Sequence, residues 1–149
     1  MELISLHTFK SLEIFSSDTD SVLDLPVVDA GISAGFPSPA EDFLDASIDL
    51  NKALIKNKAA TFYGRVKGDS MVGAGLSNGD LLIIDKSLEP TDGRIAVCFI
   101  DGDFTVKRIK IEKDVIWLVA ENKNYQPIKV TSENDFTIWG VVTNVIKSV

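Results

Sequence analysis

From residue 61 onward the chain consists of short apolar runs separated by turn residues. The runs are rich in β-branched and aromatic residues, and Gly, Asp, Asn or Pro bounds each of them. This pattern predicts strands at residues 61–67, 81–85, 94–100, 103–111, 115–120 and 137–146. Asp101 and Gly102 join two of these runs and favour a two-residue hairpin turn, which needs positive φ at both positions. Many short strands at close spacing predict a mainly β fold, a folded antiparallel sheet or barrel-like domain.

The strand expected at 103–111 contains a lysine whose surroundings would decide its chemistry. Alternation along a strand places Thr105 and Lys107 on the same face as Ile109 and Ile111. If that face is the inner one, burial lowers the pKa of Lys107 from about 10.4 and yields a free amine that can act as a general base. If the strand is a solvated edge, the side chain of Lys107 extends to the surface. Alternation alone leaves both interpretations open.

Residues 40–57 differ from the rest, because their apolar positions fit helical spacing. The spacing is interrupted near residues 47–49, which indicates one broken helix or two short ones, with Ser38 or Ser47 as the candidate N-cap. Residues 31–40 before it are small and flexible and end with two prolines. We expect a domain boundary there.

Residues 1–34 carry apolar residues without sustained periodicity, and the polar run 16–21 favours turns. We interpret this part as a flexible N-terminal arm. It contains one short extended candidate at 24–29, where Pro26 would interrupt a central strand but suits an edge or a docked peptide.

Charge and composition narrow the possible functions. The net charge of the 149 residues is −7, and it is uneven: the first 50 residues hold ten carboxylates and one Lys, whereas the rest hold twelve carboxylates and fourteen Lys or Arg. An acidic front argues against an N-terminal DNA-binding head, which needs clustered cations. One cysteine, Cys98, and one histidine, His7, exclude an intrachain disulfide, a His-based triad and a typical zinc site, so we expect no cofactor and no metal.

The apolar runs are far shorter than the roughly 18 residues of a membrane span, and the first residues lack the cationic start of a signal peptide. We therefore expect a cytoplasmic protein without membrane contact.

A glycine-rich turn at residues 68–80 separates two expected strands and holds the second candidate for chemistry. Ser70 in this turn could be a nucleophile, with nearby backbone N–H groups to hold an oxyanion. A serine before an apolar residue in such a turn also fits a helix cap. Neither Ser70 nor Lys107 is specific alone.

Together with other motifs, these two residues resemble the LexA-like family of self-cleaving serine peptidases, which use a serine and lysine dyad. The resemblance rests on separated motifs in the family's order, at residues 68–71, 79–83, 102–108, 121–128 and 140–142. It covers most of residues 35–149. Within the family the chain is similar to the UmuD-like, SOS mutagenesis branch, because residues 35–40 and 48–51 resemble the segment after the cleavage point of that branch.

The resemblance implies a mechanism and a domain organisation. Ser70 would be the nucleophile, Lys107 the general base, and the backbone N–H groups of Asp69 and Ser70 the oxyanion donors. The cleaved bond would join Ala34 to Gly35. Residues 1–34 would then be the arm that cleavage removes, and residues 35–149 the peptidase domain, with a linker and short helix at 35–57 and the β core at 58–149.

The resemblance also implies partners. These are a second copy of the chain in a homodimer, a RecA filament on single-stranded DNA that stimulates cleavage, and a UmuC-type Y-family polymerase (polymerase V) for translesion synthesis, with no sequence-specific DNA binding. We place the dimer contact at residues 137–146, unless Trp139 and its neighbours simply fill the core. Two other interpretations stay open: a fragment of a LexA-like repressor, and a non-enzymatic β-barrel adaptor with an inert dyad.

Overall fold

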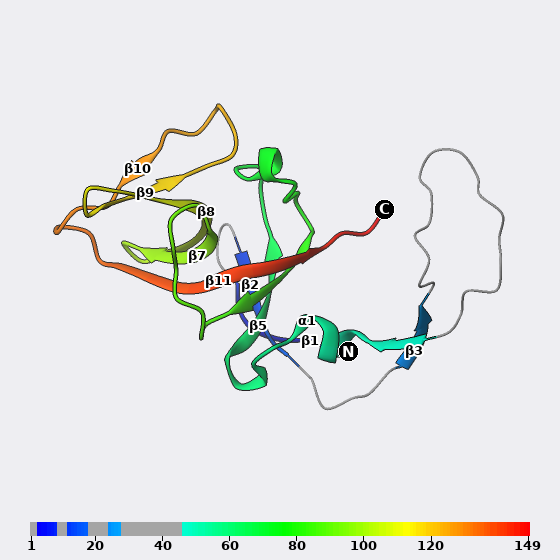
Figure 1. The fold of residues 1–149 in the computed structure, drawn as a ribbon. Helices are drawn as coiled ribbons and strands as arrows, with labels where there is room; N and C mark the ends of the chain where they lie inside the picture. The colour runs from blue at the N-terminus through cyan, green and yellow to red at the C-terminus, as the bar shows by residue number, and fades with distance from the viewer. Residues whose placement is uncertain (1–2, 9–11, 18–23, 28–45) are drawn as a thin grey trace.

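The structure is a computed structural model that describes residues 3–8, 12–17, 24–27 and 46–149 (Figure 1). Short strands dominate, and the helical elements are α1 (Leu50–Leu54) and the 3-10 turns η1 (Lys58–Ala60) and η2 (Val72–Ala74). The strands are β1 (Leu3–Thr8), β2 (Leu12–Ser17), β3 (Asp24–Val27), β4 (Ala46–Asp49), β5 (Thr61–Val66), β6 (Leu81–Asp85), β7 (Ile95–Ile100), β8 (Asp103–Glu112), β9 (Val115–Val119), β10 (Ile128–Lys129) and β11 (Phe136–Ile146).

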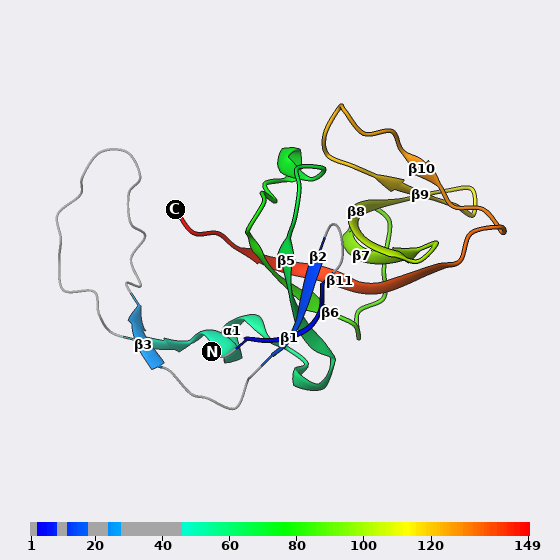
Figure 2. The ribbon, with the colours of Figure 1, turned by 180° about the vertical axis from the view of Figure 1, so that it is seen from behind.

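Most of these strands form one antiparallel sheet of nine, in the order β1-β2-β5-β6-β11-β7-β8-β9-β10. Strands β3 and β4 pair with each other in a separate two-stranded sheet, which lies to one side of the large sheet in both views (Figures 1 and 2). The expected mainly β, antiparallel and barrel-like fold is confirmed.

The predicted strands correspond to β5, β6, β7, β8, β9 and β11, with bounds that differ by no more than one residue. Asp101 and Gly102 have φ angles of 48° and 91°, so the hairpin turn has the positive φ that the sequence predicted. The extended candidate at 24–29 is β3, in which Pro26 lies opposite Ser47 on a two-stranded sheet.

Strand β11 joins the two sides of the large sheet. Its first part pairs with β7 and its second part with β6, and the register shifts after Ile138 and again after Val142. Gly140 lies at the first shift, and a Cβ there would be 2.6 Å from Cγ2 of Ile84. The close approach of β6 therefore requires glycine at this position.

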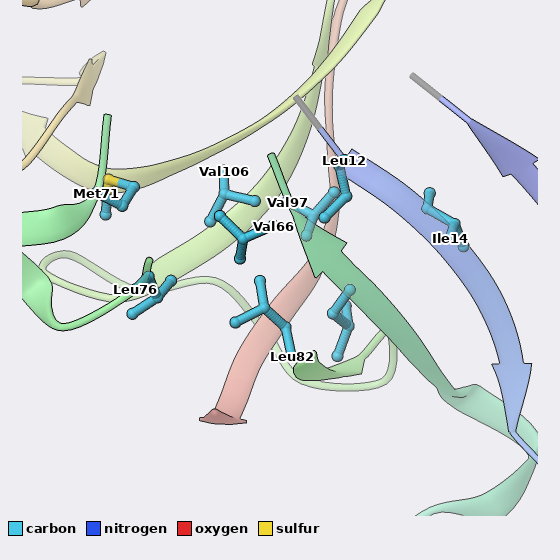
Figure 3. Packing of buried hydrophobic residues seen from close by; sticks show 9 residues of the cluster. Leu12, Ile14, Val66, Met71, Leu76, Leu82, Val97 and Val106 are labelled. Carbon is cyan, nitrogen blue, oxygen red and sulfur yellow. The ribbon is translucent and has the colours of Figure 1, made fainter. Parts of the chain in front are cut away.

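The main core brings together strands that are distant in the sheet order, because the sheet is curled. Its buried members are contributed by β2, β5, the η2 turn, β6, β7 and β8, and they are Leu12, Ile14, Val66, Met71, Leu76, Leu82, Ile84, Val97 and Val106 (Figure 3). Trp139 of β11 packs against this cluster, with its ring centroid 5.0 Å from that of Phe62 and 5.8 Å from that of Phe104. Trp139 is thus a partly buried residue at the margin of the core.

Strands β1 and β2 come from the part of the chain that the sequence pattern assigned to an arm. In the structure they extend the large sheet, since β2 pairs with β5 over Leu12–Ser16 and Val66–Phe62. Leu12, Ile14 and Phe15 are all buried, Leu12 completely. Leu12 and Ile14 belong to the main core, whereas Phe15 belongs to a second cluster with Ile55 and Tyr63. A strand that is covered on both faces shows no period-two alternation, which is why the pattern gave no signal.

Among the described residues of the predicted helix at 40–57, which are 46–57, only one turn is helical. Ala46–Asp49 is strand β4, and the helix is the single turn α1. Asp49 caps it, because its Oδ1 accepts a hydrogen bond of 3.0 Å from the backbone N–H of Asn51. The prediction of Ser47 as a cap is therefore wrong, since β3 holds that residue in extended pairing. Ser38 lies outside the described residues.

Candidate active site

Lys107 points from β8 into the protein, and its side chain reaches the glycine-rich turn. The residue is only 8% exposed. Its Nζ donates hydrogen bonds to Oγ of Ser70 at 3.2 Å, to Oγ1 of Thr105 at 2.7 Å and to the carbonyl oxygen of Val106 at 3.1 Å. The inward orientation of Lys107 is therefore the correct one of the two that alternation left open. Burial lowers the pKa of Lys107, because the charged form loses its hydration.

The three acceptors around Nζ match the three N–H bonds of an ammonium group. A neutral amine has two N–H bonds and one lone pair. The Val106 carbonyl can only accept an N–H bond, whereas both hydroxyls can also donate. When Thr105 accepts the second N–H bond, the lone pair is left for the hydroxyl of Ser70. The arrangement is therefore suited to direct the lone pair of a neutral Lys107 toward the hydroxyl proton of Ser70.

Ser70 lies in the turn between β5 and β6, close to where β5 ends. Gly68 begins the turn with a φ of 90°, and its backbone N–H donates to Oδ1 of Asn78 at 3.0 Å. Met71 follows Ser70 directly and is 2% exposed, so it anchors the turn in the main core. The helix-cap interpretation of Ser70 is wrong, because the N-cap of η2 is Met71.

A loop from a distant part of the sequence fixes the residue before Ser70. Asn122 donates from Nδ2 to the carbonyl oxygen of Asp69 at 2.9 Å, and Tyr125 donates from its hydroxyl to Oδ1 of Asp69 at 2.6 Å. The hydrogen bond to Asp69 raises the pKa of Tyr125. In addition, the backbone N–H of Gly73 donates to the carbonyl oxygen of Glu121 at 2.8 Å, and a Cβ at Gly73 would lie 2.6 Å from that oxygen. The serine turn is thus held from one side at two points.

Sequence reasoning identified residues 121–125 only through the family resemblance and gave them no role. Asn122 and Tyr125 are more than 50 positions from Asp69 in the sequence, so no local pattern indicates that they contact it. Glu121 forms an ion pair with Arg108, the neighbour of Lys107 on β8, so the same loop is connected to both candidate residues.

Two backbone N–H groups at the site have no hydrogen-bond acceptor among the described residues. Within the described part of the chain, no hydrogen bond uses the backbone N–H groups of Asp69 or Ser70. Ala34 and Gly35, the expected cleavage site, lie outside the described residues.

Other candidates have structural roles. Cys98 is completely buried in β7, and burial raises the pKa of its thiol to about 12. Asp80 and Asp85 accept hydrogen bonds from the backbone N–H groups of Ser77 and Ser87, as carboxylates beside turns commonly do. The described residues contain no group of three or more His, Cys, Asp or Glu side chains placed to hold a metal ion.

Comparison with known protein families shows which family the chain belongs to. The family model for "Peptidase S24-like" proteins matches residues 26–143, which run from the second half of β3 through β10 and include most of β11. The chain belongs to the peptidase S24-like family. This membership supports a self-cleaving serine peptidase in general terms.

Individual S24-like relatives refine the assignment. The chain is 44% identical to protein SamA of Salmonella typhimurium over 110 residues, which are 74% of this chain and 76% of SamA. It is 36% identical to protein MucA of Escherichia coli over 135 residues, 89% of this chain and 92% of MucA. A LexA repressor, from Shewanella denitrificans, is 34% identical over 142 residues, 95% of this chain and 68% of the repressor. SamA and MucA are UmuD-like, so the resemblance to that branch of the family is confirmed.

No helix in the described part of this S24-like chain has the length and apolar character that a membrane span requires.

Proposed function

We propose that this S24-like protein cuts its own Ala34–Gly35 bond with a dyad of Ser70 and Lys107, as a UmuD-like protein of the SOS response. The observation that carries the proposal is the 3.2 Å hydrogen bond between Nζ of a buried Lys107 and Oγ of Ser70. Ser70 and Lys107 stand on motifs that resemble those of the family and follow them in the same order. The lowered pKa of Lys107 favours the neutral amine.

The reaction proceeds in two steps. Neutral Lys107 takes the proton of Ser70 while Oγ attacks the carbonyl carbon of Ala34, and the backbone N–H groups of Asp69 and Ser70 stabilise the oxyanion. The Ala34–Gly35 bond then breaks, and Lys107 gives its proton to the amine of Gly35. A water molecule, activated by Lys107, hydrolyses the ester between Ser70 and Ala34, which frees the carboxyl group of Ala34 and restores the hydroxyl of Ser70.

The cleavage segment has to reach Ser70 of the same chain or of a second copy. Ala34 and Gly35 fall between β3 and β4, which pair with each other. A segment that seldom occupies the site keeps the uncut form abundant, and a partner that favours the docked state would accelerate cleavage by shifting that population.

The direct test is incubation at alkaline pH, followed by mass spectrometry of the products. We expect pieces that end at Ala34 and begin at Gly35, because a higher pH deprotonates Lys107. Ser70→Ala and Lys107→Met should stay uncut. As matched controls, Ser77→Ala in the same turn and Lys110→Met on the same strand should cut normally, and cleavage by either dyad variant would contradict the assignment.

The next proposal is that a RecA filament on single-stranded DNA provides the stimulus, and that the protein is a homodimer. Mixing the protein with RecA, nucleotide and single-stranded DNA at neutral pH should accelerate cutting strongly over the protein alone. Equal rates with and without the filament would contradict this step, and sedimentation equilibrium would test the dimer.

We further propose that the shortened dimer is an accessory subunit of a UmuC-type translesion polymerase. Residues 1–34 carry six carboxylates and one Lys, whereas residues 35–149 carry sixteen carboxylates and fourteen Lys or Arg. Cleavage therefore removes most of the negative charge, which would ease approach to a polymerase on DNA. If cut protein and Ser70→Ala protein bind the polymerase equally at low and at high salt, the charge is incidental.

Two alternative functions can be distinguished from self-cleavage by experiment. The match to a LexA repressor makes a repressor fragment the first alternative. A DNA-binding domain needs clustered cationic side chains, however, and Lys10 is the only Lys or Arg in residues 1–34. A gel-shift assay that showed sequence-specific DNA binding would favour the repressor. A protein that stays uncut at alkaline pH and with RecA would instead be an adaptor with an inert dyad.

A further inference from the structure

Two of the three strand pairings of the N-terminal part connect residues on opposite sides of the proposed cleavage site, whereas β1 and β2 both precede it. Strands β2 and β3 precede the Ala34–Gly35 bond, whereas their partners β5 and β4 follow it. Hydrolysis of that bond changes no residue of these four strands. The residues that form these pairings are therefore the same before and after the cut, but after it they belong to two separate chains.

Strand β2 is bound to β5 by more than backbone hydrogen bonds. Five residue pairs connect the strands, from Leu12 opposite Val66 to Ser16 opposite Phe62. Leu12 and Ile14 are buried in the main core on one face, and Phe15 is buried in the second cluster on the other face. Figure 3 shows Leu12 pointing from β2 toward Val97 and Val66. Departure of β2 would expose apolar surface on both faces of the sheet.

Strand β5 has a recess that fits this occupant. A Cβ at Gly64 would lie 2.9 Å from Cδ1 of Leu12 and 2.9 Å from Cδ1 of Ile84. The absence of a side chain at Gly64 thus provides the space that the side chain of Leu12 fills. In the register, Gly64 lies directly opposite Ile14, so Leu12 and Ile14 of β2 both lie next to the recess.

We infer that residues 1–34 stay bound to residues 35–149 after cleavage, so that cutting and release are separate steps. The inference rests on the proposed cleavage site. The docked fragment occupies the edge of β5, and this edge becomes available to another strand only when the fragment leaves. Cleavage converts a tethered strand into a separate ligand, so release becomes dependent on concentration. We expect a dissociation constant below about 1 μM for the fragment.

The test makes the cut without using the dyad. A recognition sequence for a site-specific protease is inserted between Ala34 and Gly35 of the full-length Ser70→Ala protein, which is then cut completely and applied to size-exclusion chromatography at 10-fold above and below about 1 μM. We expect the two pieces to elute together at the higher concentration and to separate in urea. Elution of the N-terminal piece on its own at the higher concentration would overturn the inference.

A matched pair of variants tests the contact itself. Leu12→Ala leaves the recess at Gly64 unfilled, and we expect it to raise the dissociation constant by at least about 30-fold. Glu13→Ala, a truncation at the neighbouring and partly exposed position, should change it by less than about threefold. If both variants retain the fragment as tightly as the parent protein, β2 is not what holds it, and the inference is wrong.

Failure of this inference and failure of the proposed function are distinguishable. If the protein does not cut itself at alkaline pH, the protease-cut form still reports whether β2 holds the two pieces together. If the pieces separate at once, self-cleavage at Ala34–Gly35 is untouched.

Discussion

The hydroxyl of Tyr125 donates a 2.6 Å hydrogen bond to Oδ1 of Asp69, the residue directly before Ser70. Asn122 binds the backbone carbonyl of the same aspartate. Side chain and main chain of Asp69 are therefore both held by one loop that follows β9. The conformation of the residue before the proposed nucleophile depends on this loop, and so does the direction of the two backbone N–H groups proposed for the oxyanion.

Tyr125→Phe removes one of these hydrogen bonds and leaves the ring in place. We expect the rate of alkaline self-cleavage to fall about 2- to 10-fold, as for the loss of a single hydrogen bond. The melting temperature should change little, because Tyr125 is 43% exposed. Asp69→Asn retains an oxygen acceptor for Tyr125 and should cut faster than Asp69→Ala. Unchanged cleavage by Tyr125→Phe would show that the contact does not position Ser70.

The pH dependence of cleavage should follow the deprotonation of Lys107. Because burial lowers the pKa of this residue, the rate should rise with pH and reach its midpoint below about 10.4, the value of an ordinary lysine. Thr105→Val removes an acceptor of the charged amine without changing the shape of the side chain. In this variant the midpoint should move to lower pH, and the maximal rate should fall because Lys107 is less well oriented. A single-turnover rate profile from pH 6 to 11 measures both.

Stability should also depend on Lys107, with a sign that follows from its lowered pKa. Between the folded-state pKa and about 10.4 the unfolded chain binds more protons than the folded one, so this group makes the free energy of unfolding increase with pH. Lys107→Met lacks this dependence and should be more stable than the parent at neutral pH.

Urea titrations at several pH values should show that the higher free energy of unfolding of Lys107→Met approaches that of the parent as the pH nears the pKa of a free lysine. Lys110→Met, a truncation of charge on the same strand at an exposed position, should show no such advantage. A constant difference between Lys107→Met and the parent at all pH values would contradict a buried, deprotonating Lys107.

Cys98 should be protected from thiol reagents in the folded protein. Its side chain is completely buried and burial raises its pKa to about 12, so both access and thiolate formation are suppressed. We expect alkylation at pH 8 to be slower by at least about 100-fold than in guanidinium-unfolded protein. Reaction of the folded protein at the rate of a free thiol would mean that β7 opens readily.

The strands around the site could be predicted because each follows a local rule. β6 is a continuous run of apolar and β-branched residues between turns, and the β7–β8 turn contains Asp101 and Gly102, which tolerate positive φ. Whether Lys107 faced inward could not be decided from alternation, because the answer depends on which face of β8 the rest of the sheet covers. The serine turn and the lysine were recognised, but only the fold brings them within hydrogen-bonding distance.

Three features were not predicted from local sequence patterns. β2 is apolar on both faces, with Leu12 and Phe15 buried in different clusters, and a strand of this kind does not alternate. The helical spacing expected over 40–57 is interrupted near residues 47–49, and pairing with β3, which determines the structure there, is a long-range contact that the spacing does not indicate. The contact of Tyr125 with Asp69 joins two exposed loops, and long-range hydrogen bonds of this kind leave no periodic pattern in the sequence.

The pairing of β11 with both β6 and β7 links self-cleavage to the assembly of the whole sheet. Ser70 follows β5, on the side of the sheet that β11 reaches through β6, whereas Lys107 lies on β8, on the side that β11 reaches through β7. Strand β11 thus connects the two sides that carry Oγ of Ser70 and Nζ of Lys107, the proposed reacting atoms, and its register affects how they are placed. Partial denaturation that separates β6 or β7 from β11 should abolish cutting while much of the remaining sheet persists. Self-cleavage would then report whether the sheet is correctly assembled, and it would be sensitive to a shift of one residue in the register of β11.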